Sequence, residues 1–291
     1  MSTVMNTTDL TINTTTDSAN NPSSDLAAIK TKMKATWMDG DYDTFSRYME
    51  IGAEEILGDW HIEAGKKVLD VSCGSGQTAL PAARNGAIVS GIDIAANLIQ
   101  AARNRAEAES IDVQFDEGDA EHIPYDDNSF DIVISMIGAM FAPRPEQVVS
   151  EFARVCRSGG TLHMANWTPQ SMPGQMFKIV GSYIAPPKGV EPPVLWGVEE
   201  TVTQRLNEHF KDIKLTRKYY PKWFYPFSAA ELVKYFRAHF GPVRRAFAAL
   251  DEYGQRTLFE ELENNFEMHN MATDGTLRIK GEYLDVYAIR R

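Results

Sequence analysis

The chain has 291 residues, with 40 acidic and 29 basic side chains and a formal net charge of −11. Its 43% hydrophobic and 24% charged residues are typical of globular proteins, which excludes collagen-like, wholly disordered and disulfide-framework chains. The acidic balance argues against a nucleic-acid partner or general binding to an anionic membrane surface, because both need a basic face. Two cysteines, Cys73 and Cys156, cannot form a disulfide scaffold, and since neither has a partner at metal-ligand spacing we expect no metal.

The amino-terminal segment, residues 1–24, consists mostly of Ser, Thr, Asn and Asp, a composition that predicts a disordered polar tail. It has neither the basic start and apolar core of a secretory signal nor the arginines of a transit peptide, so we expect a cytoplasmic protein. The longest near-apolar stretch, residues 132–142, is shorter than the roughly 20 residues that a membrane helix needs. We therefore expect no integral membrane segment.

The next part of the chain alternates between two periodicities. Residues 25–60 have helical spacing with a break near 39–41, and we interpret them as an amino-terminal helical lid. Five apolar runs then predict strands at 67–71, 87–93, 113–116, 130–135 and 161–165, separated by helices that include 95–109 and 145–156 and by a turn at 158–160. Buried strands that alternate with helices indicate an α/β fold with a doubly wound, mainly parallel sheet.

The rest of the chain is less regular. Residues 168–198 are rich in proline and predict a loop-rich insertion with a short helix near 175–184. A helix at 199–210, a sixth strand at 213–220 and helices at 228–240, 243–250 and 251–270 follow, and 283–289 reads as a closing strand. We divide the chain into a binding core at 61–167, an insertion and helical acceptor region at 168–282 that contributes the sixth strand, and a last strand of the core at 283–291.

Three segments at the ends of predicted strands have the chemistry of a nucleoside site. Glycines at 74 and 76 allow a tight turn that brings the backbone close to a ligand at a helix N-terminus. Asp93, which follows Gly74 by 19 residues, ends the second strand, where a carboxylate can accept both ribose hydroxyls. Asp119 beside Ala120 can accept a bond from an adenine amine. The glycine spacing alone also fits a dinucleotide fingerprint.

Taken in order, five segments resemble the class I S-adenosylmethionine-dependent methyltransferases, and they are most similar to the group that contains the ubiquinone/menaquinone C-methyltransferases. The segments are Val68-Leu69-Asp70-Val71-Ser72-Cys73-Gly74-Ser75-Gly76, Gly91-Ile92-Asp93, Gly118-Asp119-Ala120-Glu121, Phe130-Asp131-Ile132-Val133 and Arg154-Val155-Cys156-Arg157-Ser158-Gly159-Gly160. The resemblance implies a seven-stranded Rossmann-like fold, S-adenosyl-L-methionine as methyl donor and S-adenosyl-L-homocysteine as product.

The resemblance also implies roles for single residues. Asp70, Ser72, Gly74 and Gly76 would hold the methionine part of the donor, Asp93 the ribose, and Ile94, Asp119 and Ala120 the adenine, while Ser135 and Met136 would lie near the sulfonium. The family usually has glycine where this chain has Ser72, so a side chain must fit beside the bound methionine. Cys73 stands where the family often has cysteine, and we give it no redox role.

The acceptor site is less defined by the sequence. The weak candidates for a catalytic base are His163 and Tyr42, and the catalytic residues stay open. Aromatic side chains near the predicted site suggest contacts to a small, partly apolar or aromatic acceptor, methylated on C, O or S. These candidates are Tyr42 and Tyr48 on the lid, Trp167 after the fifth strand, and Trp196, Tyr220 and Trp223 in the insertion region. The alternative for the aromatics is that they pack the extra helices onto the sheet.

Two other functions remain open from the sequence. An NAD(P)-dependent oxidoreductase would use the same glycine loop, although no Tyr-x-x-x-Lys set for hydride transfer accompanies it. A catalytically silent relative would bind the nucleoside and serve as a partner protein. The sequence does not indicate the oligomeric state.

Overall fold

A computed structural model describes residues 22–291 of the chain. The predicted tail lies outside these residues except at its end, because helix α1 (Pro22–Trp37) begins before residue 25. The predicted break near residue 39 is confirmed: α2 (Tyr42–Ser46), η1 (Arg47–Met49) and α3 (Glu50–Asp59) follow it. Asp41 caps α2, since its side chain accepts a hydrogen bond from the backbone N–H of Thr44.

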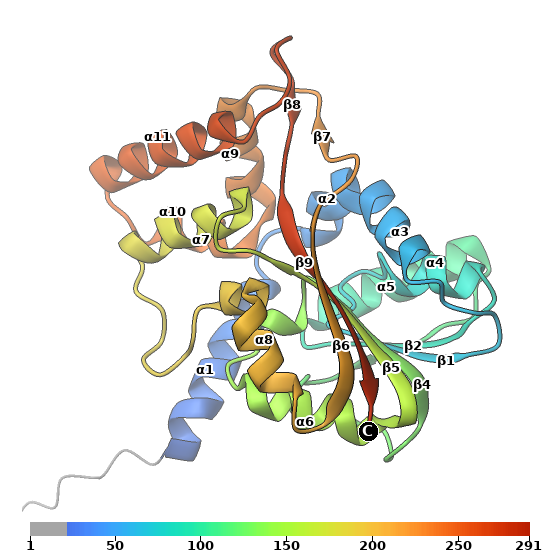
Figure 1. Cartoon of the computed structure of the whole chain (residues 1–291). Helices are drawn as coiled ribbons and strands as arrows, with labels where there is room; N and C mark the ends of the chain where they lie inside the picture. The colour runs from blue at the N-terminus through green and yellow to red at the C-terminus, as the bar shows by residue number, and fades with distance from the viewer. Residues whose placement is uncertain (1–21) are drawn as a thin grey trace, which may run out of the picture.

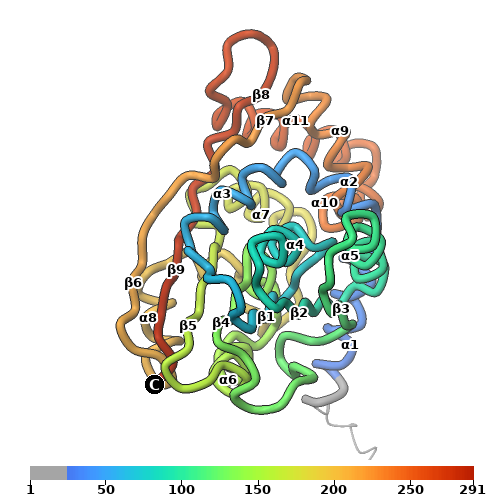
Figure 2. The backbone as a smooth tube through the Cα atoms, turned by 90° about the vertical axis from the view of Figure 1, so that its right-hand side faces the viewer, coloured from blue at the N-terminus to red at the C-terminus, as the bar shows by residue number. Residues whose placement is uncertain are grey.

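The predicted seven-stranded sheet is confirmed. Its strands are β1 (Lys67–Val71), β2 (Ile88–Asp93), β3 (Gln114–Glu117), β4 (Phe130–Met136), β5 (Cys156–Trp167), β6 (Phe210–Tyr219) and β9 (Glu282–Arg290). They lie in the order β3-β2-β1-β4-β5-β9-β6. Figure 2 shows this order with β6 on the left and β3 on the right. The first five strands are parallel to one another, and β9 pairs antiparallel with both β5 and β6. The carboxyl ends of β1 to β5 therefore meet at one edge of the sheet.

Helices cover both faces of this sheet. Helices α3, α4 (Ala79–Arg84) and α5 (Ala96–Glu109) lie on one face, and α6 (Pro145–Val155) and α8 (Glu199–Leu206) lie on the other (Figure 1). Because both faces are covered, β1 consists almost entirely of buried side chains instead of alternating polar and apolar ones.

Two boundaries differ from the prediction by four residues or more, the end of α8 and the start of β5. Helix α8 ends at Leu206, four residues early, because Phe210 already begins β6 as a fully buried residue. The turn expected at 158–160 lies within β5, where the pairing with β4 shifts between Phe130 and Ile132. Gly159, with φ of 76°, absorbs this irregularity, so the strand continues through it as a bulge.

A second group of helices lies beyond the carboxyl ends of the strands (Figure 1). It comprises α7 (Met172–Tyr183), α9 (Ala229–His239), α10 (Gly241–Ala248) and α11 (Glu252–Met268), which pack on one another, while α1 packs on α10 and α2 on α9. The sequence analysis did not foresee a small antiparallel sheet of β7 (Phe224–Tyr225) and β8 (Leu277–Arg278). Within the part of the chain described, no helix has the length and apolarity required to cross a membrane.

Candidate active site

The glycine-containing loop after β1 follows an unusual backbone path. Ser72, Gly74 and Gly76 all have positive φ, of 61°, 56° and 90°. A left-handed conformation costs a residue with a Cβ atom about 1–2 kcal/mol, so the backbone of Ser72 is strained. The methyltransferase family that the sequence resembles usually has glycine at this position. The loop nevertheless keeps this shape because the backbone N–H of Cys73 donates to Ile92 on β2 at 2.9 Å.

Asp93, at the end of β2, holds the loop from the other side. One carboxylate oxygen accepts a hydrogen bond from the backbone N–H of Gly74 at 2.9 Å, and the other accepts one from Ala95 at the start of α5 at 2.8 Å. Burial raises the pKa of the Asp93 carboxyl, and these backbone hydrogen bonds oppose that shift. Each oxygen retains a second lone pair, so the carboxylate can still accept from a ligand.

Asp70 lies beneath the loop and is fully buried. One of its oxygens accepts from the Thr78 hydroxyl at 2.5 Å, and the other has no hydrogen-bond partner among the described residues. Burial raises the pKa of Asp70 to about 7, although the hydrogen bond from Thr78 works in the opposite direction. Asp70 therefore supports the loop and the start of α4, and it lines none of the three cavities described next.

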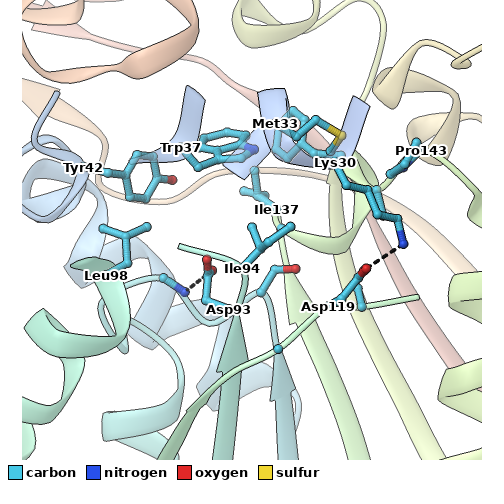
Figure 3. A pocket seen from close by; sticks show the side chains of 17 residues that line it. Lys30, Met33, Trp37, Tyr42, Asp93, Ile94, Leu98, Asp119, Ile137 and Pro143 are labelled. Atoms are coloured by element: carbon cyan, nitrogen blue, oxygen red, sulfur yellow. Dashed lines mark hydrogen bonds and ion pairs between the residues drawn. The ribbon is translucent and has the colours of Figure 1, made fainter. Parts of the chain in front are cut away.

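The first cavity lies over the ends of β2 and β3 and encloses about 660 Å³, its open mouth included. Four of the predicted nucleoside contacts, Asp93, Ile94, Asp119 and Ala120, line it (Figure 3). Helix α1 covers it with Lys30, Met33 and Trp37, a contribution that the sequence analysis did not specify. Two carboxylates around an apolar slot suit a nucleoside, because its hydroxyls and amine donate hydrogen bonds while the faces of its flat base pack against apolar side chains.

Lys30 anchors this cover. Its ammonium nitrogen lies 2.5 Å from Asp119 Oδ2 and 2.6 Å from Glu121 Oε2, as Figure 3 shows for the first pair. The second oxygen of Asp119 accepts from the backbone N–H of Glu121 at 2.9 Å. Asp119 therefore has one partner on each oxygen, both within the protein.

The second cavity adjoins the glycine loop and encloses about 500 Å³. Ser72, Gly74, Met136 and Tyr220 line it, as do Gln77 and Thr78, which the sequence analysis did not name. A Cβ atom on Gly74 would lie 3.1 Å from Gln77 Oε1 and would fill this cradle. The space beside a bare backbone suits the amino-acid end of a ligand whose nucleoside occupies the first cavity, which is the shape of S-adenosylmethionine.

The third cavity, of about 380 Å³ with its open mouth included, lies between the sheet edge and the second group of helices. Its lining is almost entirely aromatic and aliphatic: Trp37, Tyr42, Phe45, Met49, Ile137, Phe141, Trp167, Pro173, Met176, Phe177, Trp223, Phe236 and Phe240. Among the described residues, Tyr42 is the one titratable side chain in this lining. Burial raises the pKa of Tyr42 to about 12, and the nearby Asp93 carboxylate adds to the shift.

Tyr42 and Ile137 are common to the linings of all three cavities. Trp37 and Phe141 are shared by the first and third, and Met49 by the second and third. The three spaces therefore adjoin at one point, between the start of α2 and the turn after β4.

Several predicted site residues lie elsewhere. Gly76 packs against Leu80, and Ser135 is buried with its hydroxyl donating to Val71 O, so neither lines a cavity. Tyr48 packs on Tyr225 instead, and Trp196 is buried with the Arg205 guanidinium 4.7 Å from its ring centre.

His163 lies between Trp60 and Tyr287, away from the cavities. Burial lowers its pKa to about 4, against the influence of Asp285. The structure thus gives the two weak base candidates no support: His163 is remote, and Tyr42 remains protonated at neutral pH.

Comparisons with known proteins agree with this geometry. A family model described as a methyltransferase domain matches residues 69–164. An uncharacterized protein of Mycobacterium tuberculosis is 36% identical over 198 residues, which cover 67% of this chain and 72% of the relative. A ubiquinone biosynthesis O-methyltransferase of Coxiella burnetii is 32% identical over 118 residues, 40% of this chain and 50% of the relative.

The fold also matches solved structures. The crystal structure of a putative methyltransferase from Bacillus halodurans superposes with a TM-score of 0.55 at 20% identity, covering 82% of this chain and 97% of that one. The chain belongs to the class I S-adenosylmethionine-dependent methyltransferases. It is a methyltransferase with S-adenosylmethionine as its cofactor, and the oxidoreductase alternative is not supported.

Further parts of the site, on α1 and in the turn after β4, were not predicted from the sequence. Lys30, Met33 and Trp37 were placed on the lid helix but not in the nucleoside cavity. Ile137, which lines all three cavities as Tyr42 does, was not identified. The neighbouring Gly138 is the sequence feature that could have indicated this turn. A Cβ atom at Gly138 would lie 2.5 Å from the Ser72 Cβ, so the turn after β4 packs directly against the glycine loop.

Proposed function

We propose that this methyltransferase acts on a small, partly apolar or aromatic acceptor that binds in the third cavity. The observation that carries the proposal is the lining of that cavity, which is aromatic and aliphatic and adjoins both other cavities at Tyr42 and Ile137. Aromatic walls favour flat apolar molecules through offset and edge-to-face contacts.

We infer that the first cavity binds the adenosine part of the donor and the second its methionine part. Asp93 would accept from the ribose hydroxyls, Asp119 from the adenine amine, and Ile94, Ala120 and Leu98 would contact the base. The glycine-loop backbone at Ser72 and Gly74, with Met136 nearby, would flank the methionine part. Residues 25–60 would then serve as the lid over donor and acceptor.

The bound donor supplies an activated methyl group: the acceptor's lone pair bonds to the methyl carbon while the carbon–sulfur bond breaks and leaves its electron pair on sulfur. The residues of the chain align the reactants and exclude water, and such alignment can contribute several kcal/mol. Because Tyr42 stays neutral, it does not take a proton from the acceptor in the third cavity, and the acceptor would lose that proton to solvent before it enters. This favours acceptors whose nucleophile forms without a protein base, such as a thiolate or an acidic phenol.

The relative from Coxiella burnetii carries the name of a ubiquinone biosynthesis O-methyltransferase, which supports an aromatic hydroxyl as one class of acceptor. The lining residues do not distinguish O from S or C, so the three atoms remain alternatives.

Turnover tests the proposal. The purified chain is incubated with S-adenosylmethionine and each of thiophenol, hydroquinone and phenol, and S-adenosylhomocysteine is measured. We expect the thiol, which ionises near neutral pH, to exceed both the quinol and phenol, whose acidities are similar. We also expect Trp223→Ala to reduce turnover of every active acceptor. Turnover that depends on hydrophilic amines instead, or that survives Trp223→Ala unchanged, would contradict an acceptor site in the third cavity. A chain that binds both nucleosides but methylates none of a broad acceptor panel would fit the silent partner protein.

A further inference from the structure

Ile137 has a backbone conformation that a β-branched residue rarely adopts. Its φ is 53°, in the left-handed region. Valine and isoleucine are disfavoured there because the branched side chain crowds its own backbone. Residues held in such conformations concentrate at functional sites, where the surrounding structure imposes them.

Four contacts impose this conformation on the turn after β4. The Ser135 hydroxyl donates to Val71 O at 2.8 Å and accepts from the Ala139 N–H at 3.0 Å. These two hydrogen bonds connect the residues on either side of the turn to each other and to β1. The Ile137 N–H donates to Ala165 O on β5 at 2.8 Å. Gly138 approaches Ser72 so closely that any side chain would clash. The backbone at Ile137 is therefore fixed by β1, β5 and the glycine loop together.

The fixed backbone directs the Ile137 side chain to the point where the three cavities adjoin, with Tyr42 as the second shared residue (Figure 3). Under the proposed function, this is where the donor methyl faces the acceptor. A rigid branched aliphatic group and a flat aromatic ring then bound the passage between the donor and acceptor cavities.

We propose that Ile137 is a positioning residue for methyl transfer: its strained backbone holds the branched side chain against the donor methyl and limits how the acceptor approaches it. This inference rests on the proposed function of the three cavities. Ser135 lines none of the three cavities, and it contributes by fixing the backbone of the turn that carries Ile137. The arrangement selects acceptors that present a narrow or flat edge to the methyl group.

Substitutions at Ile137 test separately whether its backbone is strained and whether its side chain contacts the donor methyl group. Ile137→Ala keeps a Cβ atom and hence much of the strain, whereas Ile137→Gly removes it. We expect Ile137→Gly to melt at a higher temperature than Ile137→Ala, the reverse of the usual order of glycine and alanine. The matched control is Ser110, which is exposed at the end of α5 and has φ of 55°. There we expect the same order of melting temperatures for the Gly and Ala variants.

The contact is tested by binding, without an acceptor. S-Adenosylmethionine and S-adenosylhomocysteine differ by the methyl group and its charge, so the ratio of their affinities reports contacts at that point. We expect both Ile137 variants to lower the preference for S-adenosylmethionine at least threefold while changing the affinity for S-adenosylhomocysteine less than twofold. Ile137→Val should retain the wild-type ratio, and the Ser110 variants should leave it unchanged.

The outcomes distinguish the inference from the proposed function. If the wild type binds both nucleosides and the ratio is unaltered in Ile137→Gly and Ile137→Ala, the positioning role is wrong while the donor site stands. If Ile137→Gly melts below Ile137→Ala, the strain does not hold the side chain in place and the inference fails on that ground. If the wild type binds neither nucleoside, the proposed function falls and the inference falls with it.

Discussion

Lys30 on α1 and Asp119, which follows β3, form an ion pair of 2.5 Å between residues 89 positions apart in the chain. The pair joins α1, which covers the first cavity, to the segment that follows β3. Asp119 is also the residue that we propose reads the adenine amine, so the same carboxylate connects the lid to the donor. We therefore expect lid and donor binding to be coupled through this contact.

The first prediction follows from that coupling. Lys30→Met removes the anchor of α1, because the variant loses the contacts with both Asp119 and Glu121. We expect S-adenosylmethionine to dissociate about two- to fivefold faster, the scale of partly exposed ion pairs. Glu121 keeps a partner in the variant because Arg144 Nε lies 2.7 Å from it. Stopped-flow displacement at two salt concentrations is the measurement. Lys32→Met, at an exposed position of the same helix, is the control, and equal rates in the two variants would refute the anchoring role.

A second prediction concerns Asp93. We expect Asp93→Ala to weaken S-adenosylmethionine binding roughly 10- to 100-fold, the scale of hydrogen bonds to a charged acceptor. The variant should also melt at a lower temperature, because the carboxylate holds the backbone of Gly74 and Ala95. Calorimetric titration measures the first effect, with Asp274→Ala in a distant exposed loop as control. Unaltered affinity would show that Asp93 serves the loop alone.

The third prediction is a pH dependence of stability. Burial raises the pKa of Asp70 to about 7, above the value of about 3.9 for an unfolded aspartate. Between these values the folded state binds more protons than the unfolded state, so this group's contribution to stability falls as pH rises from about 4 to about 7. Asp70→Asn, which can still accept from Thr78, removes the titration.

We therefore expect the melting temperature of Asp70→Asn, relative to wild type, to increase between pH 5 and pH 8 by several degrees, since 1 kcal/mol shifts it by about 2–4 °C in a domain of this size. Comparison with wild type at each pH cancels the contribution of His163, which titrates in both. A difference that stays constant with pH would mean that Asp70 is ionised throughout the range.

A fourth prediction addresses the missing base. Because Tyr42 remains protonated up to a pKa of about 12, Tyr42→Phe should reduce turnover of thiophenol less than about tenfold, well below the roughly 10²- to 10⁴-fold contribution of a general base. The pH profile between 6 and 9 should follow the acceptor and be the same in both proteins. A 100-fold loss with an altered profile would identify Tyr42 as the base.

The sequence predicts the architecture well because most of it depends on local patterns. The buried runs at 67–71 and 130–135, with helices between them, determine a parallel sheet, and parallel strands bring Asp93 and Asp119 to one edge. The contacts of these two residues with the first cavity follow directly from that placement.

The acceptor cavity was predicted less completely because it is assembled from distant segments. Trp167 and Trp223 were identified, and their rings stack with centres 5.3 Å apart. Phe141, Phe177 and Phe240 were not, since nothing in their neighbouring residues distinguishes them from ordinary core. Trp196 and Tyr48 carried the same composition signal, yet they pack away from the cavities. Ile137 depends on a backbone angle, which no side-chain pattern encodes.

Calorimetric titration of the full chain with S-adenosylmethionine, S-adenosylhomocysteine and NAD tests the central claim most directly, that the cavities around the glycine loop form a methyl-donor site. We predict micromolar binding of the two sulfur nucleosides and none of NAD. Binding of NAD with no response to either sulfur nucleoside would contradict the assignment of the site.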